Sequence, residues 1–144
     1  MEFTQKGETE AILPKNLFYE ATDMTPKIHL DYTSGIFEIS GISIPENAWD
    51  FFRPVINWLD NYLEYPQDKT VFKIFLEYFN SGSSKCLWDI FKKMEALGRK
   101  TCSVLIEWHF DKSDEDMHEA GEDFESILDI PFTFVEDKST KGSQ

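Results

Sequence analysis

The sequence predicts a single α/β domain, in which about five strands form a mixed sheet and three helices pack on it. Segments in which apolar residues alternate with polar ones are interleaved with segments in which they recur every three to four positions. The chain is 144 residues long, which is a typical length for a single domain, and 41% of its residues are hydrophobic, which is enough to form a core. Strands that are joined through helices are expected to pair in parallel, with right-handed crossovers.

An N-terminal β-hairpin is the first predicted unit. Ile28, Leu30 and Tyr32 alternate with polar residues and predict a strand, and the segment 36–40 shows the same alternation. The short Gly-containing turn between them is typical of a hairpin. The segment 16–22 is a candidate for a further short strand.

A first helix is predicted to begin near Ser43, because Ser43 and Glu46 have the spacing of a capping box. Pro45 is compatible with the first turn of a helix. Pro54 lies inside the predicted helix and is expected to kink it or weaken one turn. The predicted core-facing stripe consists of Trp49, Phe52, Ile56, Leu59 and Leu63.

The middle of the chain predicts a central strand followed by a helix. Residues 70–79 are nearly all apolar, which is typical of a strand buried on both faces. A loop is expected at 80–83, and a helix from about residue 84 to residue 97, with Gly98 as its stop signal.

Three further elements complete the predicted domain. Alternation predicts a strand over 101–110, and a helical stripe predicts a helix over about 114–128, with Ser113 as its cap. A short last strand is expected at 132–135.

The two ends of the chain are polar, so we expect flexible tails at 1–15 and 137–144 around a domain at 16–136. The N-terminus has no basic and apolar leader, which predicts a cytoplasmic protein. Cys86 and Cys102 lie in apolar surroundings and are expected to be reduced, buried thiols.

The net charge of −13 excludes a nucleic-acid binder, because phosphate backbones require a basic surface. No apolar run reaches the roughly 18–20 residues that a membrane span needs, so membrane insertion is not expected. Residues 107–129 hold ten acidic residues against one lysine, and thus carry −9 of the total charge. This acidic segment is either a solvated helix face or a docking face for a basic partner surface.

Catalytic and metal-binding motifs are missing from the sequence. The three histidines, His29, His109 and His118, belong to no recognisable catalytic or metal-binding motif, so we predict neither a metal site nor a cofactor. Glu107 and His109 share a strand face near a strand end, where α/β sheets often bind ligands. They are the candidate polar groups if the chain is a small-ligand-binding or enzymatic domain.

The connection at 80–85 (Asn-Ser-Gly-Ser-Ser-Lys) joins the predicted central strand to a helix N-terminus. It is not a nucleotide-binding P-loop, since the required Gly-Lys-Ser/Thr ending is missing. Helix N-termini stabilise negative charge, and a phosphoserine would add about −1.5 to −2 charges there. The alternative is a serine-rich cap that only begins the helix.

Around this connection the sequence resembles the SiaC family of bacterial regulatory phosphoproteins. The stretch 76–91 (LEYFNSGSSKCLWDIF) is similar to the family pattern Tyr-(Phe/Leu)-Asn-Thr-Ser-Ser-x-Lys. Other pieces agree in order and spacing, namely Pro45-Glu46-Asn47, Trp58-Leu59, Trp108-His109-Phe110, Ala120-Gly121-Glu122-Asp123-Phe124 and Pro131-Phe132. The resemblance covers about residues 15–136.

The resemblance implies a STAS-like fold, of the anti-sigma-factor-antagonist type, and a protein that is not an enzyme. In this family a Ser/Thr protein kinase phosphorylates the threonine of the motif, and a PP2C-like protein phosphatase removes the phosphate. The unphosphorylated form binds and activates a diguanylate cyclase, and so promotes cyclic-di-GMP signalling and biofilm formation.

Carried over to this chain, the phosphorylated position falls on Ser81, with Ser83 and Ser84 as alternatives. Gly82 replaces a family serine and is expected to make the connection more flexible. The residues expected to shape the loop or bind the partner are Asn80, Gly82, Ser83, Ser84, Lys85 and Asp89.

Three hypotheses therefore remain at this point. The first is an adaptor that phosphorylation at Ser81 switches off. The second is a constitutive protein-interaction module whose serines are never modified. The third is a small-ligand-binding or enzymatic domain that uses Glu107 and His109 at the same edge of the sheet as the connection 80–85. A deep cleft at His109 would favour the third hypothesis, and a shallow rim would favour docking of a protein.

Overall fold

The computed structural model describes residues 14–100 and 103–137, which form a six-stranded mixed sheet and three helices. The predicted α/β class is confirmed, with one strand more than the five expected, because the segment near 16–22 does form a short strand. The predicted flexible tails lie largely outside the described residues. In chain order the elements are β1 (Leu17–Tyr19), β2 (Lys27–Asp31), β3 (Ile36–Ser43), α2 (Ala48–Tyr62), β4 (Lys69–Phe79), α3 (Ser81–Gly98), β5 (Ser103–Asp111), α4 (Glu115–Ile127) and β6 (Phe132–Asp137).

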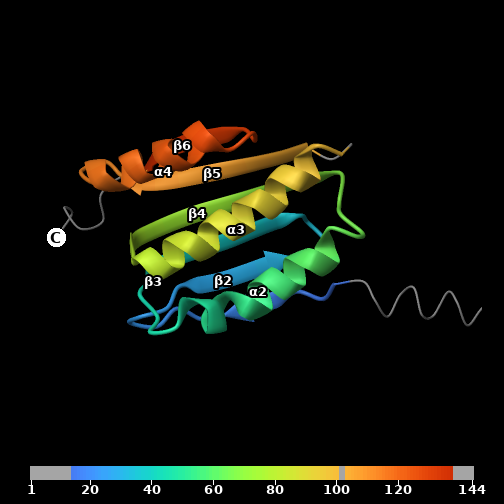
Figure 1. The fold of residues 1–144 in the computed structure, drawn as a ribbon, viewed down its shortest axis with the longest axis horizontal. Helices are drawn as coiled ribbons and strands as arrows, with labels where there is room; N and C mark the ends of the chain where they lie inside the picture. Colours follow the sequence, from blue (N-terminus) through green and yellow to red (C-terminus); the bar gives the residue numbers. More distant parts are fainter. Residues whose placement is uncertain (1–13, 101–102, 138–144) are drawn as a thin grey trace, which may run out of the picture.

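The strands lie in the sheet in the order of the sequence, from β1 to β6. Strands β1, β2 and β3 pair antiparallel, whereas β3, β4, β5 and β6 pair in parallel. Each parallel pair is joined through one helix. Such crossover connections are right-handed, and each one here leads to the next strand in the same direction across the sheet, so the three helices lie on the same face. Figure 1 shows α2, α3 and α4 on the same side of the sheet. None of the three described helices covers the opposite face of the sheet, which we call the open face.

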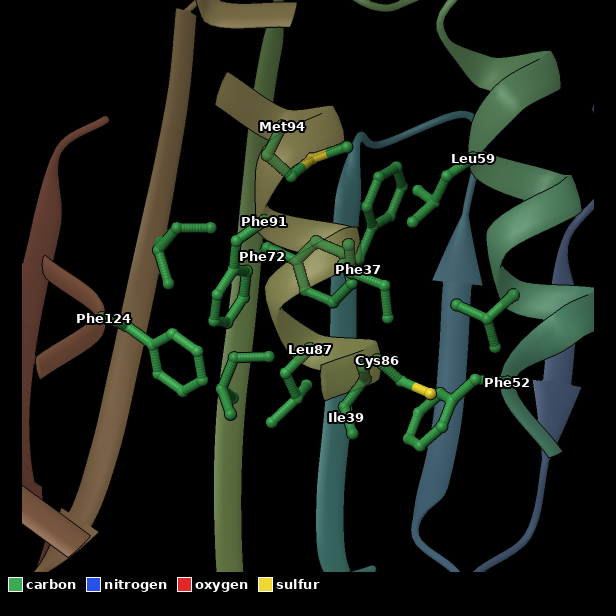
Figure 2. Packing of buried hydrophobic residues seen from close by; sticks show 14 of the residues in the cluster. Phe37, Ile39, Phe52, Leu59, Phe72, Cys86, Leu87, Phe91, Met94 and Phe124 are labelled. Atoms are coloured by element: carbon green, nitrogen blue, oxygen red, sulfur yellow. The ribbon is translucent and has the colours of Figure 1, made fainter. Parts of the chain in front are cut away.

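The core fills the space between the helices and the sheet (Figure 2). Phe37 lies at its centre, fully buried, with its ring edge-to-face against the rings of Trp58, Tyr62 and Phe72 at 4.9–5.4 Å between centroids. The strand alternation predicted from the sequence decides which residues enter this core. Among the described helices, none is both long and apolar enough to cross a membrane.

Helix α2 begins later than predicted. Asn47 caps it, since its Oδ1 accepts a hydrogen bond from the backbone N–H of Asp50 at 3.1 Å. Ser43 is the last residue of β3, so the predicted capping box is wrong. Trp49, predicted to face the core, is 45% exposed, and the helix continues through Pro54. The buried face consists of Ala48, Phe52, Val55, Trp58, Leu59 and Tyr62.

The starts of α3 and α4 also differ from prediction. Helix α3 begins at Ser81 rather than near residue 84, because Asn80 caps it and the small residues that follow fit a first turn. Helix α4 is capped by Asp114 instead of Ser113. The Ser113 hydroxyl donates to the carboxylate of Asp111 at 2.8 Å.

Both cysteines were predicted to be buried thiols. Cys86 is a free, fully buried thiol, and burial raises its pKa to about 11, with a further contribution from the nearby Asp89 carboxylate. The thiol therefore stays protonated at neutral pH and packs as a small apolar group. Cys102 lies outside the described residues.

A buried carboxylate joins the last turns of α3 to the connection between α4 and β6. The side chain of Glu95 is 4% exposed and accepts hydrogen bonds from Lys92 Nζ and from the backbone N–H of Asp129, both at 2.6 Å. Arg99 Nη2 lies 3.3 Å from the same carboxylate. The Lys92 hydrogen bond, followed by that of Asp129, holds the pKa of Glu95 below its ordinary value of 4.5, although burial acts in the opposite direction.

Replacement of this carboxylate, Glu95→Gln, should lower the Tm at pH 7. Because the pKa of Glu95 is lower in the folded than in the unfolded chain, its stabilisation is complete above about 4.5 and is lost as the pH falls through the folded pKa. The difference in Tm between wild type and variant should therefore shrink on acidification, as followed by circular dichroism between neutral and acidic pH. Glu125→Gln, at an exposed position on α4, is the matched control. A difference in Tm that does not change with pH would contradict this account.

Candidate functional site

Asn80 fixes the junction between β4 and α3. Its Oδ1 accepts a hydrogen bond from the backbone N–H of Ser83 at 2.9 Å. Its own backbone N–H donates to the carbonyl of Ser43 at 3.0 Å, and its Nδ2 donates to the carbonyl of Pro45 at 3.3 Å. One side chain thus caps α3 and ties its first turn to the segment that leads from β3 into α2.

Ser83 is buried beneath this first turn. Its side chain is fully buried, its Oγ lies 2.7 Å from the Oγ of Ser43, and it also donates to the Ser43 carbonyl at 3.0 Å. These two hydroxyl groups satisfy each other inside the protein. Ser83, predicted to shape the loop, therefore forms a tie between α3 and the end of β3.

Ser81 is the first residue of α3 and is exposed to solvent. The first backbone N–H groups of a helix have no partner within the helix, and the helix dipole is positive there. The first turn of α3 contains no acidic residue. Lys85, four residues on, is exposed on the next turn. Ser81 thus lies at a positive helix end whose own first turn has no negative side chain.

Gly82 does not lie in a flexible loop, contrary to the expectation from the sequence. It is the second residue of α3, and a Cβ added there would lie 3.2 Å from the Cβ of Ala48. The missing side chain lets the start of α3 pack closely against the start of α2.

Asp89 was expected to shape the loop or to bind the partner. It is half-buried in α3, and its carboxylate lies close enough to Cys86 to raise the pKa of that thiol. Lys92 pairs with Glu95, and Lys93 Nζ lies 2.7 Å from the carboxylate of Asp60 on α2.

Two hollows lie beside the start of α3, at the end of β4. One has a volume of about 380 Å³ and the other about 250 Å³, and Phe79 and Ala120 line both of them. Because they share these two residues, we treat them as one depression, the α4 groove. Its lining comprises Glu77, Tyr78, Phe79, Ser84, Asp114, Asp116, Met117, Ala120, Asp123, Phe124 and Ile127.

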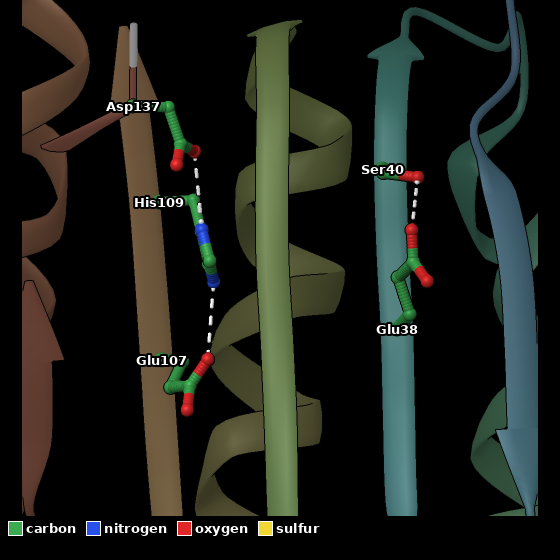
Figure 3. Close-up of polar contacts among 5 residues, drawn as sticks. All are labelled: Glu38, Ser40, Glu107, His109 and Asp137. Atoms are coloured by element: carbon green, nitrogen blue, oxygen red, sulfur yellow. Dashed lines mark hydrogen bonds and ion pairs between the residues drawn. The ribbon is translucent and has the colours of Figure 1, made fainter. Parts of the chain in front are cut away.

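Glu107 and His109 lie on the open face of the sheet, across the sheet from α3, and not at the Ser81 rim (Figure 3). The His109 ring nitrogens lie 3.1 Å from carboxylate oxygens of Glu107 and Asp137, and its ring stacks on Phe75 at 5.9 Å. The hollow beside His109 measures about 240 Å³. Both nitrogens are engaged, so the ring is held as part of a polar cluster. Within residues 14–100 and 103–137, no group of three or more His, Cys, Asp or Glu side chains is placed to hold a metal ion.

Comparison with known proteins decides the family. The model of the SiaC family, described as SiaC family regulatory phosphoprotein, matches residues 19–137. The chain belongs to the SiaC family. The resemblance inferred from the motif around Ser81 is thereby confirmed for nearly the whole described domain.

Proteins similar to this SiaC-family chain include several from Pseudomonas aeruginosa. An uncharacterized protein of strain UCBPP-PA14 is 31% identical over 117 residues, which cover 81% of this chain and 93% of that protein. The crystal structure of apo-SiaC is 29% identical, covers 83% of this chain and 98% of that one, and has a TM-score of 0.77. A chain from the crystal structure of the diguanylate cyclase SiaD in complex with its activator SiaC is 30% identical, covers 84% of this chain and 99% of that one, and has a TM-score of 0.80.

Sequence reasoning missed two features of this SiaC-family site. Ser43 was interpreted as a helix cap, so its buried contact with Ser83 was not foreseen. The α4 groove was not foreseen either, because it combines the end of β4 with α4, which are far apart in the sequence. The only sequence signal for the groove was the acidic segment 107–129, which includes three of its four carboxylates.

Proposed function

We propose that this SiaC-family chain is a non-enzymatic signalling adaptor of the cytoplasm, whose unphosphorylated form binds and activates a diguanylate cyclase. Activation of the cyclase would raise cyclic-di-GMP signalling and promote biofilm formation. The proposal is supported by the family, whose members are regulatory phosphoproteins, and by similarity to SiaC, a chain that in one crystal structure is in complex with SiaD as its activator.

The proposed phosphorylation site is Ser81, modified by a Ser/Thr protein kinase and restored by a PP2C-like phosphatase. One observation carries this choice: the hydroxyl of Ser81 is exposed at the first residue of α3, whereas that of Ser83 is fully buried against Ser43. Ser84, the other alternative, is half-buried and faces the α4 groove. Of the three hydroxyl groups, that of Ser81 is the one that a kinase reaches most readily without opening the helix.

Phosphorylation would change which partners this surface accepts. A phosphate on Ser81 adds about −1.5 to −2 charges beside the α4 groove and the exposed side chain of Tyr78. A partner that docks on this apolar rim would remove water from the phosphate. Without a paired cation, that desolvation costs several kcal/mol. The cyclase is therefore expected to bind only the unmodified form.

The test compares three forms of the protein: unmodified, Ser81→Ala, and a form that carries phosphoserine at position 81, introduced during translation. Each full-length diguanylate cyclase encoded in the same genome is purified and titrated with the three forms, and its cyclic-di-GMP production is measured. The unmodified and Ser81→Ala forms should bind and activate one cyclase, and the phosphoserine form should bind at least about tenfold more weakly.

The matched control carries phosphoserine at position 34, an exposed serine in the turn before β3, at the opposite end of the sheet. It should bind the cyclase like the unmodified protein. Equal binding by the two phosphoserine forms and the unmodified form would argue against the switch and for a constitutive interaction module.

A further inference from the structure

The α4 groove has an apolar floor that the described part of the chain leaves open to solvent. Phe79 and Ala120 lie where its two hollows meet, and Ile127 and Tyr78 at its edges are 62% and 59% exposed. Large apolar side chains with that much exposure beside a depression are typical of a protein-interaction surface. The groove thus has the shape and apolar content of a docking site.

The charged side chains that line the groove are all acidic. Among the residues that the structure describes, its lining includes four carboxylates and no lysine or arginine. Three of the four, Asp114, Asp116 and Asp123, belong to α4 or its cap. The fourth, Glu77, belongs to β4, and the α3 side contributes the neutral Ser84. An occupant with complementary charge therefore carries basic side chains toward α4 and apolar side chains toward Phe79 and α3.

We propose that the α4 groove binds a basic amphipathic helix, and that this helix belongs to the cyclase; the second part rests on the function proposed above. Helix α4 has 13 residues and is about 20 Å long, so a partner helix of similar length can lie along it. The C-terminal segment of the chain, 138–144, is basic but has no apolar residue, so it lacks the side chains that the floor requires.

Ser81 lies on the same helix, α3, as Ser84, which lines the groove. Residues three apart lie on the same face of a helix, so Ser81 is one turn before Ser84, on the face of α3 that borders the groove. Ser81 itself lines neither hollow, so a phosphate there would lie at the α3 end of the groove, next to the side formed by Ser84. A modification of Ser81 would thus change the charge beside the groove without blocking the groove itself.

The first experiment uses a labelled helical peptide of leucine and lysine, about 15 residues long, and its counterpart with glutamate in place of lysine. Fluorescence anisotropy should show that the full chain binds the lysine peptide and not the glutamate peptide. Asp123→Lys should weaken binding roughly five- to tenfold. Glu125→Lys makes the same change in net charge two residues away, at an exposed position outside the groove, and should alter binding by less than about twofold.

A second variant tests the apolar contact without a change in charge. Ile127→Ser removes an exposed side chain from the groove and leaves the buried core intact, so the fold is not at risk. It should weaken binding of both the lysine peptide and the cyclase at least about fivefold. Equal weakening by Asp123→Lys and Glu125→Lys, or wild-type binding by Ile127→Ser, would overturn the groove as a docking site.

These experiments distinguish an error in the groove proposal from an error in the proposed function. If the cyclase binds the wild type and releases the phosphoserine-81 form, yet binds Asp123→Lys and Ile127→Ser normally, the function stands and the groove proposal falls. If no cyclase binds the wild type, the function falls, and the peptide comparison alone decides whether the groove accepts a basic helix.

Discussion

Replacing Gly121 with alanine should destabilise the protein by about 2 kcal/mol, which corresponds to a fall in Tm of roughly 5–10 °C. Gly121 lies on the buried side of α4. A Cβ at this position would come within 2.5 Å of Cδ1 and 2.6 Å of Nε1 of Trp108, and within 2.8 Å of Phe134 Cε2. Contacts this short require the indole or the helix to move.

Trp108 has little freedom to move away. Its side chain is fully buried, and its Nε1 donates a hydrogen bond to the carbonyl of Met117 at 3.0 Å, in the first turn of the same helix. Overpacking of a rigid core costs about 1–3 kcal/mol, whereas the better helix propensity of alanine returns at most about 1 kcal/mol. The steric term therefore decides the sign of the effect.

Gly98→Ala is the matched control for this prediction, because Gly98 is also a helical glycine. A Cβ there would meet Ile130 Cγ2 at 3.7 Å and Val104 at 3.9 Å, which are ordinary contacts. This variant should be neutral or up to about 1 kcal/mol more stable than the wild type. Urea unfolding followed by tryptophan fluorescence measures both variants. Equal stabilities would show that α4 does not approach β5 as closely as the structure has it.

The sequence predicted most of the fold because burial follows local periodicity. The alternation in β2, β3 and β5 and the apolar run of β4 each depend on neighbouring residues only, so each strand could be placed. The helix starts were less well predicted, because Ser43 and Asn47 both satisfy local capping rules. The choice between them depends on a contact between Ser43 and Ser83, which are 40 residues apart.

The candidate site was predictable in part for the same reason. That a serine-rich turn would begin a helix beside a buried strand followed from local sequence, and Ser81 is indeed exposed there. Which of the neighbouring hydroxyl groups would be buried did not follow, because β3 supplies the covering group. Likewise, the acidic segment was visible in the sequence. Its position beside Phe79, however, depends on how the crossover from β5 places α4 against the end of β4.

Aspartate substitutions at Ser81 and Ser83 should change stability in opposite directions. Ser83→Asp places a carboxylate where the native side chain is fully buried and its hydroxyl is hydrogen-bonded to the hydroxyl and the carbonyl of Ser43. A buried charge without a cation costs about 3–5 kcal/mol, so this variant should be severely destabilised. Ser81→Asp places the same charge at the exposed first residue of α3, whose first turn has no acidic residue, and should gain about 0.3–1 kcal/mol from the helix dipole.

Urea unfolding of both aspartate variants, with Ser83→Ala as a third protein, measures these effects. Ser83→Ala separates the loss of the hydrogen bonds from the burial of charge, and should cost only about 1–2 kcal/mol. If Ser83→Asp proves as stable as Ser81→Asp, then the Ser83 hydroxyl is not held inside the protein, and the argument for Ser81 as the phosphorylated residue loses its basis. If Ser83→Asp is strongly destabilised and Ser81→Asp is not, Ser81 is the position at which a phosphate is compatible with a folded α3. The first turn of α3 then stabilises a negative charge at the surface, at residue 81, and is destabilised by one in the interior, at residue 83.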